Sequence, residues 1–381
     1  MPSLPLFGFE QENLQDSGFP CGEKCAGPGC VAVVPQSKTK LVGIARLAAE
    51  GEHIRDGHNV EYFTLQSKSI LNRCTSPRMP FTWTVNPYRG CEFACKYCYA
   101  RYTHEFMELG DLEFERKIYV KQQAAWLLRQ DLKRVKAGEE IAIGTATDPY
   151  QPAEKRYEVT RALLEVLAEG EGQILGIVTK SNLILRDLEL LQRVARRNKL
   201  AVHMTVTTVD TQLARILEPR APRPDLRLEA VHELVAGGIE AGVIAAPVIP
   251  GITDSPKALE ALVRATAQAG GRTIYANPLF LKPCSATIFL PLLQKEFPQL
   301  VEQYRERYSS QAFVSAAYRK RISDLMSSLR RKYGLSSRED RRLDMGKDTR
   351  EKSGGCGSAS RKKHFKPLAK TPLLEDQMAL F

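Results

Sequence analysis

Residues 86–106 read NPYRGCEFACKYCYARYTHEF and place Cys91, Cys95 and Cys98 within eight positions, among tyrosines and phenylalanines. A structural zinc site is closed by four protein ligands, so these three thiols would need a distant fourth partner. A cuboidal 4Fe–4S cluster normally takes four thiolates, and three leave one iron open to a small-molecule ligand. The spacing therefore favours an iron–sulfur cluster with an open iron, with zinc or buried thiols as the alternative.

Short apolar strands and amphipathic helices alternate around this stretch, from about residue 80 to 285. The strand patterns are TWTVNP, KIYVK, EIAIGTAT, QILGIVTKS, LAVHMTVTTVD, EAGVIAAPVIPG and TIYANPLFL. Helical patterns follow near 122–136, 157–169 and 186–197. This alternation predicts an α/β fold whose parallel strands are joined by right-handed crossovers and close into a complete or partial (β/α) barrel.

Composition divides the chain into five parts. Residues 1–38, rich in Gly, Pro and Cys, predict an irregular leader, and 39–79 an N-terminal extension that packs on the barrel. The barrel is expected over 80–290 and further helices over 291–335. The polar, charge-mixed residues 336–381 predict a disordered basic tail.

The Cys-x3-Cys-x2-Cys spacing, with Tyr97 just before the third cysteine, resembles the signature of radical S-adenosylmethionine enzymes. Together with SKSILNR, GTATDPYQPAEK, IVTKS and APVIPGITD, it resembles the uncharacterised group related to spore photoproduct lyase, also called DNA-repair-photolyase-like. The likeness covers about residues 65–290. It implies a partial (β/α)6 barrel of the TIM type, with the site at the carboxyl ends of the strands.

The resemblance also implies a chemistry. The three cysteines would hold a 4Fe–4S cluster, and S-adenosylmethionine would chelate the open iron through its amino and carboxylate groups. An electron from a donor such as flavodoxin or ferredoxin would then cleave the cofactor to a 5′-deoxyadenosyl radical. Tyr97 is expected near the adenine and is a candidate radical relay, with shielding of the cluster from water as the alternative.

Polar residues at the ends of the predicted strands are the next candidates. Thr147, Asp148 and Gln151 follow one strand and are expected to face the barrel mouth, where Thr147 and Asp148 would hold the cofactor. Asp148 is equally consistent with a helix N-cap beside turn prolines. Lys180 and Ser181 end the next strand, where the Lys180 ammonium would pair with the cofactor carboxylate.

Two further candidates come later in the chain. Thr207 ends the following unit and is expected to reach the cofactor ribose. Arg227 is a second candidate for the cofactor carboxylate, with a surface position as the alternative. His203 lies within an apolar strand and is expected in the core rather than at a ligand site.

One departure from the family pattern concerns the hydrogen-atom donor. Spore photoproduct lyase carries a cysteine just before a Ser-Asp pair on the second-strand loop, and GTATDP puts Ala146 at that place. The dimer-splitting reaction is therefore not carried over. Cys284, in LKPCSAT after the last strand, is the candidate catalytic thiol, with buried packing as the alternative.

The remaining cysteines give weaker indications. Cys21, Cys25 and Cys30 are close together in CGEKCAGPGC and are candidates for a second metal site, although their spacing matches no established pattern. Cys74 lacks an evident partner, and Cys356 lies in SGGCGS, where oxidation is more expected than function.

Charge bears on the substrate. A formal net charge of +11 and a pI near 9.2 favour a polyanionic partner. We therefore expect an enzyme that repairs or modifies nucleic acid. A radical enzyme acting on a protein side chain or small molecule, and a non-catalytic iron–sulfur module, are the alternatives. No apolar run is long enough to span a bilayer, and no signal peptide is evident, so a cytoplasmic protein is expected.

The last residues of the chain suggest a further partner. Residues 377–381 read QMALF and resemble the Gln-x-x-Leu-Phe peptide with which bacterial polymerases and repair proteins bind the DNA sliding clamp. Gln377 would make polar contacts while Leu380 and Phe381 fill an apolar pocket. Folding of this peptide back onto the barrel is the alternative.

Overall fold

The computed structural model describes residues 41–76 and 79–337. Several sequence predictions therefore lie outside the described residues. They concern the leader, almost all of the tail, and the residues Cys21, Cys25, Cys30, Cys356 and Gln377 to Phe381.

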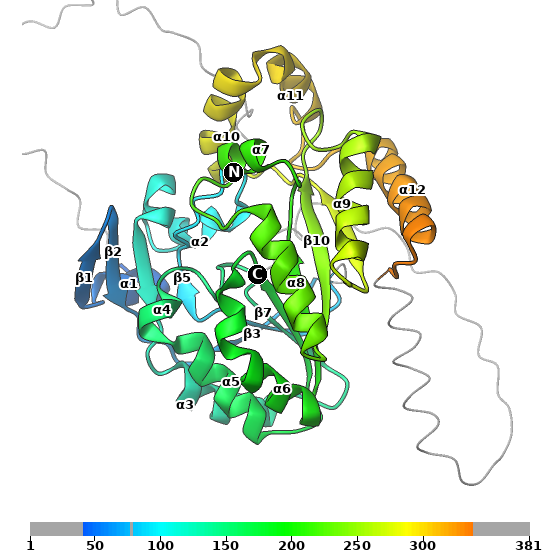
Figure 1. The fold of residues 1–381 in the computed structure, drawn as a ribbon. Helices are drawn as coiled ribbons and strands as arrows, with labels where there is room; N and C mark the ends of the chain where they lie inside the picture. The colour runs from blue at the N-terminus through cyan, green and yellow to red at the C-terminus, as the bar shows by residue number, and fades with distance from the viewer. Residues whose placement is uncertain (1–40, 77–78, 338–381) are drawn as a thin grey trace, which may run out of the picture.

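A seven-stranded sheet forms the centre of the structure (Figure 1), with strand order β11-β10-β9-β8-β7-β4-β3. The six strands from β4 to β11 in this sheet run parallel, and β3 is antiparallel to β4. Their bounds are β3 Leu71–Arg73, β4 Trp83–Val85, β7 Glu140–Ile143, β8 Ile174–Thr179, β9 Lys199–Thr205, β10 Glu240–Val248 and β11 Ile274–Pro278. Within the described part of the chain, β3 and β11 are the two edges. The predicted α/β fold with a parallel sheet is confirmed.

Helices connect the parallel strands and cover the sheet (Figure 1). Their bounds are α3 Ala124–Asp131, α4 Glu154–Tyr157, α5 Val159–Glu169, α6 Leu188–Arg197, α7 Thr211–Leu217, α8 Pro224–Ala236 and α9 Pro256–Gln268. Short 3₁₀ turns extend two of them, at Leu132–Arg134 and Asn182–Asp187. Local sequence sets the helix starts: Asp210 caps α7 through its carboxylate, and Ser255 caps α9 through its hydroxyl, with Pro256 in the first turn.

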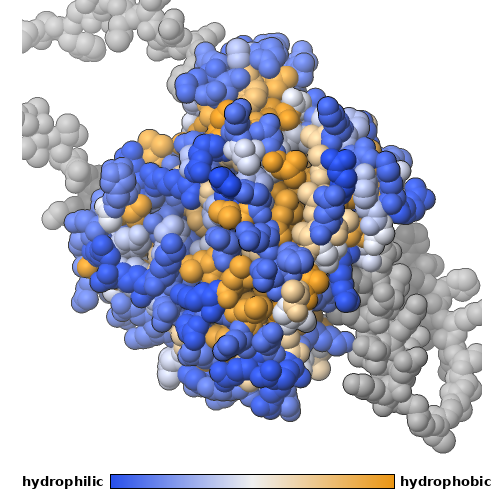
Figure 2. All heavy atoms as spheres, viewed as in Figure 1, coloured by the Kyte–Doolittle hydropathy of each residue, from blue (hydrophilic) through white to orange (hydrophobic). Residues whose placement is uncertain are grey.

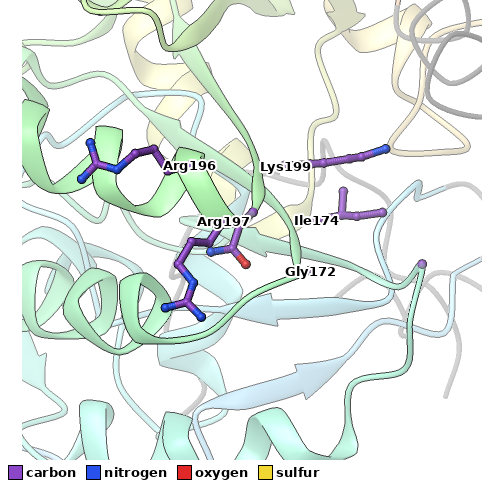
Figure 3. Close-up of a pocket in the computed structure, with 7 residues that line it drawn as sticks. Gly172, Ile174, Arg196, Arg197 and Lys199 are labelled. Carbon is purple, nitrogen blue, oxygen red and sulfur yellow. The ribbon is translucent and has the colours of Figure 1, made fainter. Parts of the chain in front are cut away.

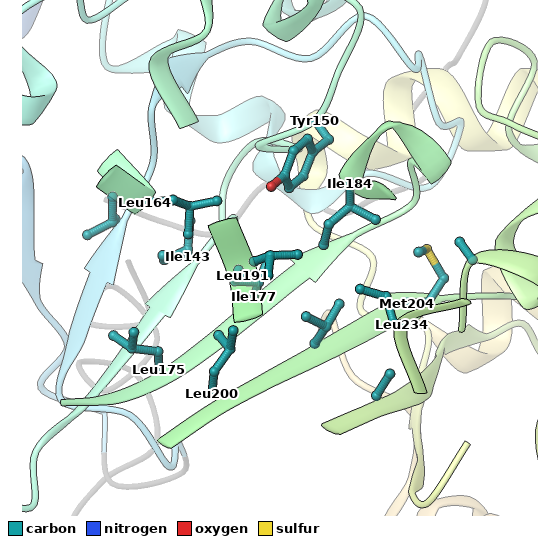
Figure 4. Packing of buried hydrophobic residues seen from close by; sticks show 14 of the residues in the cluster. Ile143, Tyr150, Leu164, Leu175, Ile177, Ile184, Leu191, Leu200, Met204 and Leu234 are labelled. Atoms are coloured by element: carbon teal, nitrogen blue, oxygen red, sulfur yellow. The ribbon is translucent and has the colours of Figure 1, made fainter. Parts of the chain in front are cut away.

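The core fills the space between the sheet and these helices. Figure 4 shows Ile143, Leu175, Ile177, Leu191 and Met204 packed together, drawn from three neighbouring strands and α6. On the face seen in Figure 2, apolar side chains gather in the seam between α8 and α9, framed by hydrophilic residues on the outer sides of the helices. Burial of this kind contributes about 25 cal/mol per Å² of apolar surface and is the main force holding the sheet and helices together.

A second sheet lies beside the first, with strand order β1-β2-β6-β5. It is formed by β1 His53–Gly57, β2 Val60–Thr64, β5 Tyr88–Arg89 and β6 Lys117–Val120, and helix α1 Gly43–Ala49 precedes it. The prediction that KIYVK joins the same parallel series as the other strands is wrong. Strand β6 pairs with β2 and β5 instead, because periodicity identifies a strand but not the neighbour with which it forms hydrogen bonds.

The chain between the cysteines and β6, and the chain after β11, are mainly helical. The first part contains the 3₁₀ turns η1 Tyr99–Arg101 and η2 Asp111–Glu115 and helix α2 Tyr102–Glu105. The second contains α10 Pro283–Glu296, the turn η5 Pro298–Leu300, α11 Val301–Arg307 and α12 Ala316–Tyr333. Helix α12 packs on α9 and β11, as Figure 1 shows in orange. Over residues 41–76 and 79–337, no helix has the length and apolar character needed to cross a bilayer.

A pocket lies at the amino ends of β7, β8 and β9 (Figure 3). Its lining includes Gly138, Gly172 and Asn198, together with the basic residues Arg196, Arg197 and Lys199. The polar candidates identified from the sequence follow strands rather than precede them. This pocket is therefore at the opposite end of the sheet from those polar candidates.

Candidate functional site

The three cysteines lie on a loop that begins directly after β5. Backbone hydrogen bonds fix the loop to distant parts of the chain: Cys91 N donates to Phe114 O at 3.0 Å, and Lys96 N donates to Leu217 O at 2.9 Å. Ala94, between the first two cysteines, has a φ of +54°, which lets the loop reverse direction. The loop is therefore held from both sides before any cofactor is bound.

The glycine before the first cysteine is required by its backbone geometry. Gly90 has a φ of +82°, and a Cβ atom there would lie 2.6 Å from Lys117 O. Its carbonyl oxygen accepts hydrogen bonds from Thr147 Oγ1 at 2.5 Å and from Gln151 Nε2 at 3.1 Å. Gln151 also accepts from Glu92 N at 3.0 Å. The Thr147 and Gln151 side chains thus bind the start of the cysteine loop and position it.

The thiols are free; Cys95 is buried, and Cys91 and Cys98 are partly exposed. None of the three forms a disulfide. Burial raises the pKa of the Cys95 thiol to about 12, and it also raises the pKa values of the Cys91 and Cys98 thiols. Because metal ligands bind as thiolates, loading of this loop must release protons. In the described part of the chain, no three His, Cys, Asp or Glu residues are close enough to hold a single metal ion. The thiolates of a 4Fe–4S cluster bind different irons.

Two polar side chains donate hydrogen bonds to backbone carbonyl groups of the cysteine loop. The buried guanidinium of Arg101 forms an ion pair with Glu115, and its Nη2 donates to Cys95 O at 3.3 Å. Ser285 Oγ donates to Cys98 O at 3.0 Å. The neighbouring Cys284 is buried, its Sγ lies 3.9 Å from Tyr99 O, and burial raises the pKa of its thiol to about 12. Cys284 therefore packs behind the cysteine loop at the start of α10.

Asp148 joins the ends of β7 and β8. Its Oδ1 accepts from Thr179 Oγ1 at 2.6 Å and from Tyr150 N at 2.9 Å, and its Oδ2 accepts from Lys180 N at 2.7 Å. The carboxylate is buried, and burial raises its pKa. Asp148 thus fixes the backbone of Lys180. The helix N-cap interpretation of Asp148 is wrong, because the N-cap of α4 is Ala153.

Lys180 presents its ammonium group to the cysteine loop. Its Nζ lies 5.7 Å from the centre of the Tyr97 ring, within range of a cation–π contact. Burial lowers the pKa of Lys180, but the neighbouring Cys95 and Glu218 raise it more, so the net shift is upward and the amine stays protonated. In residues 41–76 and 79–337, the Nζ of Lys180 forms no salt bridge within 4.0 Å.

Tyr97 belongs to a buried network that the sequence did not reveal. Its hydroxyl donates to Glu218 Oε1 and lies 3.0 Å from Thr207 Oγ1, which itself donates to Glu218 at 2.8 Å. Arg227 Nη2 lies 2.5 Å from Glu218 Oε2, and Arg227 Nη1 donates to Thr205 O at 3.1 Å. Although burial raises the pKa of Glu218, the Arg227 and Lys180 cations lower it more, so the carboxylate is ionised.

The structure shows where four further residues discussed in the sequence analysis lie, and it corrects the interpretation of one of them. The surface interpretation of Arg227 is wrong: the side chain is about 1% exposed, because Glu218 neutralises its charge inside the protein. His203 lies in the core on β9, as expected. Ser181 Oγ accepts from Leu183 N at 3.3 Å and caps a 3₁₀ turn, and Ala146 N donates to Asn86 Oδ1 at 2.8 Å, with no thiol at this place.

Family comparison agrees with this arrangement. The model of the radical SAM superfamily matches residues 85–263, which include the cysteine loop and strands β7 to β10. The chain belongs to the radical SAM superfamily. Membership implies S-adenosylmethionine and a 4Fe–4S cluster as cofactors.

The chain is similar to proteins of other organisms over much of its length. It is 35% identical to an uncharacterized protein of Mycobacterium tuberculosis over 280 residues, which are 73% of this chain and 82% of the relative. An uncharacterized protein of Methanocaldococcus jannaschii is 29% identical over 195 residues, 51% of this chain and 70% of the relative.

The fold is similar to that of spore photoproduct lyase. A mutant of that enzyme with dinucleoside spore photoproduct has a TM-score of 0.54 at 16% identity, over 79% of this chain and 87% of the lyase. A second mutant, with bound AdoMet and the dinucleoside, has a TM-score of 0.52 at 17% identity, over 70% and 78% of the two chains.

Proposed function

We propose that this chain is a radical S-adenosylmethionine enzyme that repairs or modifies nucleic acid. Cys91, Cys95 and Cys98 would hold the cluster, and the cofactor would lie between the cysteine loop and the carboxyl ends of β8 and β9. When bound and reduced, the cluster supplies the electron that cleaves S-adenosylmethionine. The chain's own residues bind and orient the cofactor and exclude water from this reaction.

The ammonium of Lys180 is the observation that carries the proposal. It is a protonated, largely buried cation that lies over Tyr97 and has no carboxylate within salt-bridge distance in the described part of the chain. A buried charge of this kind is costly unless a partner neutralises it. The carboxylate of S-adenosylmethionine is such a partner, and Lys180 would bind it as a point charge.

The neighbouring residues divide into binding and positioning roles. Tyr97 and Thr207 would face the cofactor while Glu218 holds both hydroxyl groups. Arg227 is fully engaged with Glu218, Pro222 O and Thr205 O, so it would position Glu218 rather than bind the cofactor directly. Ser181, Thr147 and Asp148 would shape the site through the backbone atoms that their side chains bind.

Nucleic acid is the proposed substrate class for two reasons. The chain carries a net charge of +11, which favours a polyanion, and its fold is that of an enzyme solved with a dinucleoside photoproduct. The place of the lyase cysteine is taken by Ala146. We therefore propose that the hydrogen atom returned to the product comes from another group, for which Cys284 and Tyr97 are the candidates on this chain.

Anaerobic reconstitution with iron, sulfide, reductant and S-adenosylmethionine tests the reaction. We expect 5′-deoxyadenosine to form, and to form faster when single-stranded or ultraviolet-damaged DNA is added. Product formation that ignores DNA and RNA would remove the substrate class while keeping the enzyme class. A reconstituted protein that never forms 5′-deoxyadenosine would contradict the proposed reaction itself.

We also retain three partner and location proposals. An electron donor such as flavodoxin or ferredoxin would reduce the cluster in the cytoplasm. The terminal peptide Gln377 to Phe381 would bind the host's sliding clamp, and a peptide of residues 370–381 tests this directly. Micromolar binding that disappears when Leu380 and Phe381 are both replaced by Ala would support a role in DNA maintenance, and no binding at about 100-fold higher concentration would reject it.

A further inference from the structure

Two cations near the cysteine loop have no role in the site described so far. Arg89 is the last residue of β5, two positions before Cys91, and Lys121 follows the last residue of β6. Lys121 is about 6% exposed, whereas Arg89 is partly exposed. The pair therefore lies mainly inside the protein, with access to solvent on the side of Arg89.

The strand register places both side chains on one face. In the antiparallel β5–β6 ladder, Arg89 is opposite Tyr119, and Lys121 N donates to Pro87 O at 3.3 Å. Residues two positions apart on a strand share a face, so Arg89 and Lys121 are diagonal neighbours. Consistent with this proximity, burial and the Arg89 charge together lower the pKa of Lys121 to about 7.

Both cations lack an anion. Arg89 Nη1 donates to Thr103 O at 3.3 Å, and Lys121 Nζ donates to Asn86 O at 2.8 Å. Both acceptors are neutral carbonyl groups. Over residues 41–76 and 79–337, neither cation has a carboxylate within salt-bridge distance. With a pKa of about 7, the Lys121 amine is only partly protonated near neutral pH, because its charged form is desolvated and repelled by Arg89. An anion bound between the two side chains would neutralise both and favour the protonated amine.

Their surroundings connect this pair to the barrel mouth. Asn86, whose carbonyl binds Lys121, uses its side chain to accept from Ala146 N at 2.8 Å and to donate to Thr145 Oγ1 at 3.2 Å. Residues 145 and 146 follow β7, at the same end of the sheet as the cysteine loop. An anion held by Arg89 and Lys121 would therefore lie beside the site.

We propose that Arg89 and Lys121 form a subsite for an oxyanion, a phosphate or carboxylate group carried by the molecule on which this enzyme acts. The guanidinium offers a planar pair of donors and the ammonium a compact point charge, a combination suited to a tetrahedral or planar oxyanion. The assignment of this anion to the substrate rests on the proposed function. The existence of the anion site does not.

Chemical footprinting of Lys121 tests the subsite on the full chain. The protein is treated anaerobically with formaldehyde and cyanoborohydride, and methylation of each lysine is followed by mass spectrometry, with inorganic phosphate, acetate or a thymidine dinucleotide as the probe. We expect millimolar phosphate to slow methylation of Lys121 about tenfold, since two charge-assisted contacts cover the amine. Lys133, an exposed lysine of the same chain, is the internal control and is expected to react at an unchanged rate.

The three probes distinguish the sources of the anion. Protection by acetate alone indicates a carboxylate subsite, and protection by phosphate and the dinucleotide indicates a phosphate or phosphodiester subsite. The variant Arg89→Met is expected to abolish protection, and Arg89→Lys to restore part of it. If Arg89→Met does not fold, the protection measured in the unaltered protein still decides the question.

Two results would overturn the subsite. One is a rate of Lys121 methylation that none of the probes changes at about 50 mM, well above the range of a specific site. The other is complete resistance of Lys121 with and without the probes, which would show that solutes cannot reach it. The footprint requires no turnover. A protein that makes 5′-deoxyadenosine but shows no protection rejects the subsite alone, and protection without 5′-deoxyadenosine rejects the proposed reaction alone.

Discussion

The hydroxyl of Tyr97 donates a hydrogen bond to the carboxylate of Glu218, a residue 121 positions further along the chain. The same carboxylate forms an ion pair with Arg227, which lies in α8 between β9 and β10. Glu218 therefore links the cysteine loop to this part of the chain. Both ionised side chains are about 1–2% exposed, and their charges compensate each other inside the protein. This pair is therefore both a stabilising contact and a support for Tyr97 in the cysteine loop.

The variant Glu218→Gln tests the cost of breaking that pair. Loss of the negative charge leaves the Arg227 guanidinium buried without a counter-ion, and such changes typically destabilise by about 3–5 kcal/mol. We expect a decrease of this size in the free energy of unfolding, measured by urea denaturation. Asp225→Asn is the matched control, because the Arg223–Asp225 ion pair is half exposed and contributes at most about 1 kcal/mol. Equal effects of the two variants would contradict the network.

The cysteine loop gives a prediction about iron. Replacement of Cys91, Cys95 or Cys98 by Ala is expected to abolish the oxygen-sensitive cluster, measured as iron and sulfide content and by the visible absorption spectrum. Cys74→Ala is the control, since Cys74 is buried in a separate apolar cluster with Phe81. Full iron content in all three loop variants would reject the assignment.

Lys180→Met is expected to weaken binding of S-adenosylmethionine about ten- to a hundred-fold, because a hydrogen bond to a charged group contributes roughly 1.5–3 kcal/mol. Iron content is expected to stay at the level of the unaltered protein. Equilibrium dialysis of the reconstituted protein measures the affinity, with Lys133→Met as a surface control. Unchanged affinity would remove Lys180 from the site.

His104 predicts a dependence of stability on pH. It is fully buried, its Nε2 lies 3.0 Å from Lys117 O, and burial lowers its pKa from 6.5 to about 4. In the unfolded chain the imidazole takes up a proton as the pH falls through 6.5, whereas in the folded protein it stays neutral down to about pH 4. The neutral His104 therefore makes its full contribution to the free energy of unfolding above pH 6.5. As the pH falls from 6.5 to about 4, that free energy decreases by about 3 kcal/mol in total.

The measurement compares urea unfolding at pH 7.5 and pH 5 for the unaltered protein and for His104→Gln. The variant removes the titrating group, so its stability is expected to fall less on acidification. The difference between the two proteins isolates this residue from the other acid-sensitive groups. An identical loss of stability in both would show that His104 is not the source.

The sequence predicted the parallel strands well where alternating patterns recur. The segments EIAIGTAT, QILGIVTKS and EAGVIAAPVIPG contain β7, β8 and β10, and residues at their carboxyl ends do surround the cysteine loop. Strand β6 was harder to place, although it has four residues like β7. Strand β6 has an apolar pattern like the others, but the strands with which it pairs lie more than 25 positions earlier in the chain, so its own sequence does not identify them.

The candidate site was predicted in its cysteines and less well in its charges. Arginine side chains are usually exposed, and burial of Arg227 is possible because its ion pair with Glu218 offsets the cost of desolvating the charge. Nothing in ARILEPRAP distinguishes Glu218 from an exposed glutamate. Thr147 and Gln151 were expected to face the mouth, but their hydrogen bonds to Gly90 O depend on a loop closure that no local pattern encodes.

Gly90 links the small sheet to the loop that follows β7. Its Cα lies close to Lys117 O and Phe114 O beside the small sheet. Its carbonyl oxygen accepts hydrogen bonds from the side chains of Thr147 and Gln151, in the loop after β7. Neither sheet can shift without moving the peptide that precedes the first cysteine. Amide hydrogen exchange is therefore expected to slow together in β6 and around residues 147–151 when the cysteine loop takes up iron, as in a single cooperative unit. Oxidative loss of iron would then be expected to speed exchange in both segments together.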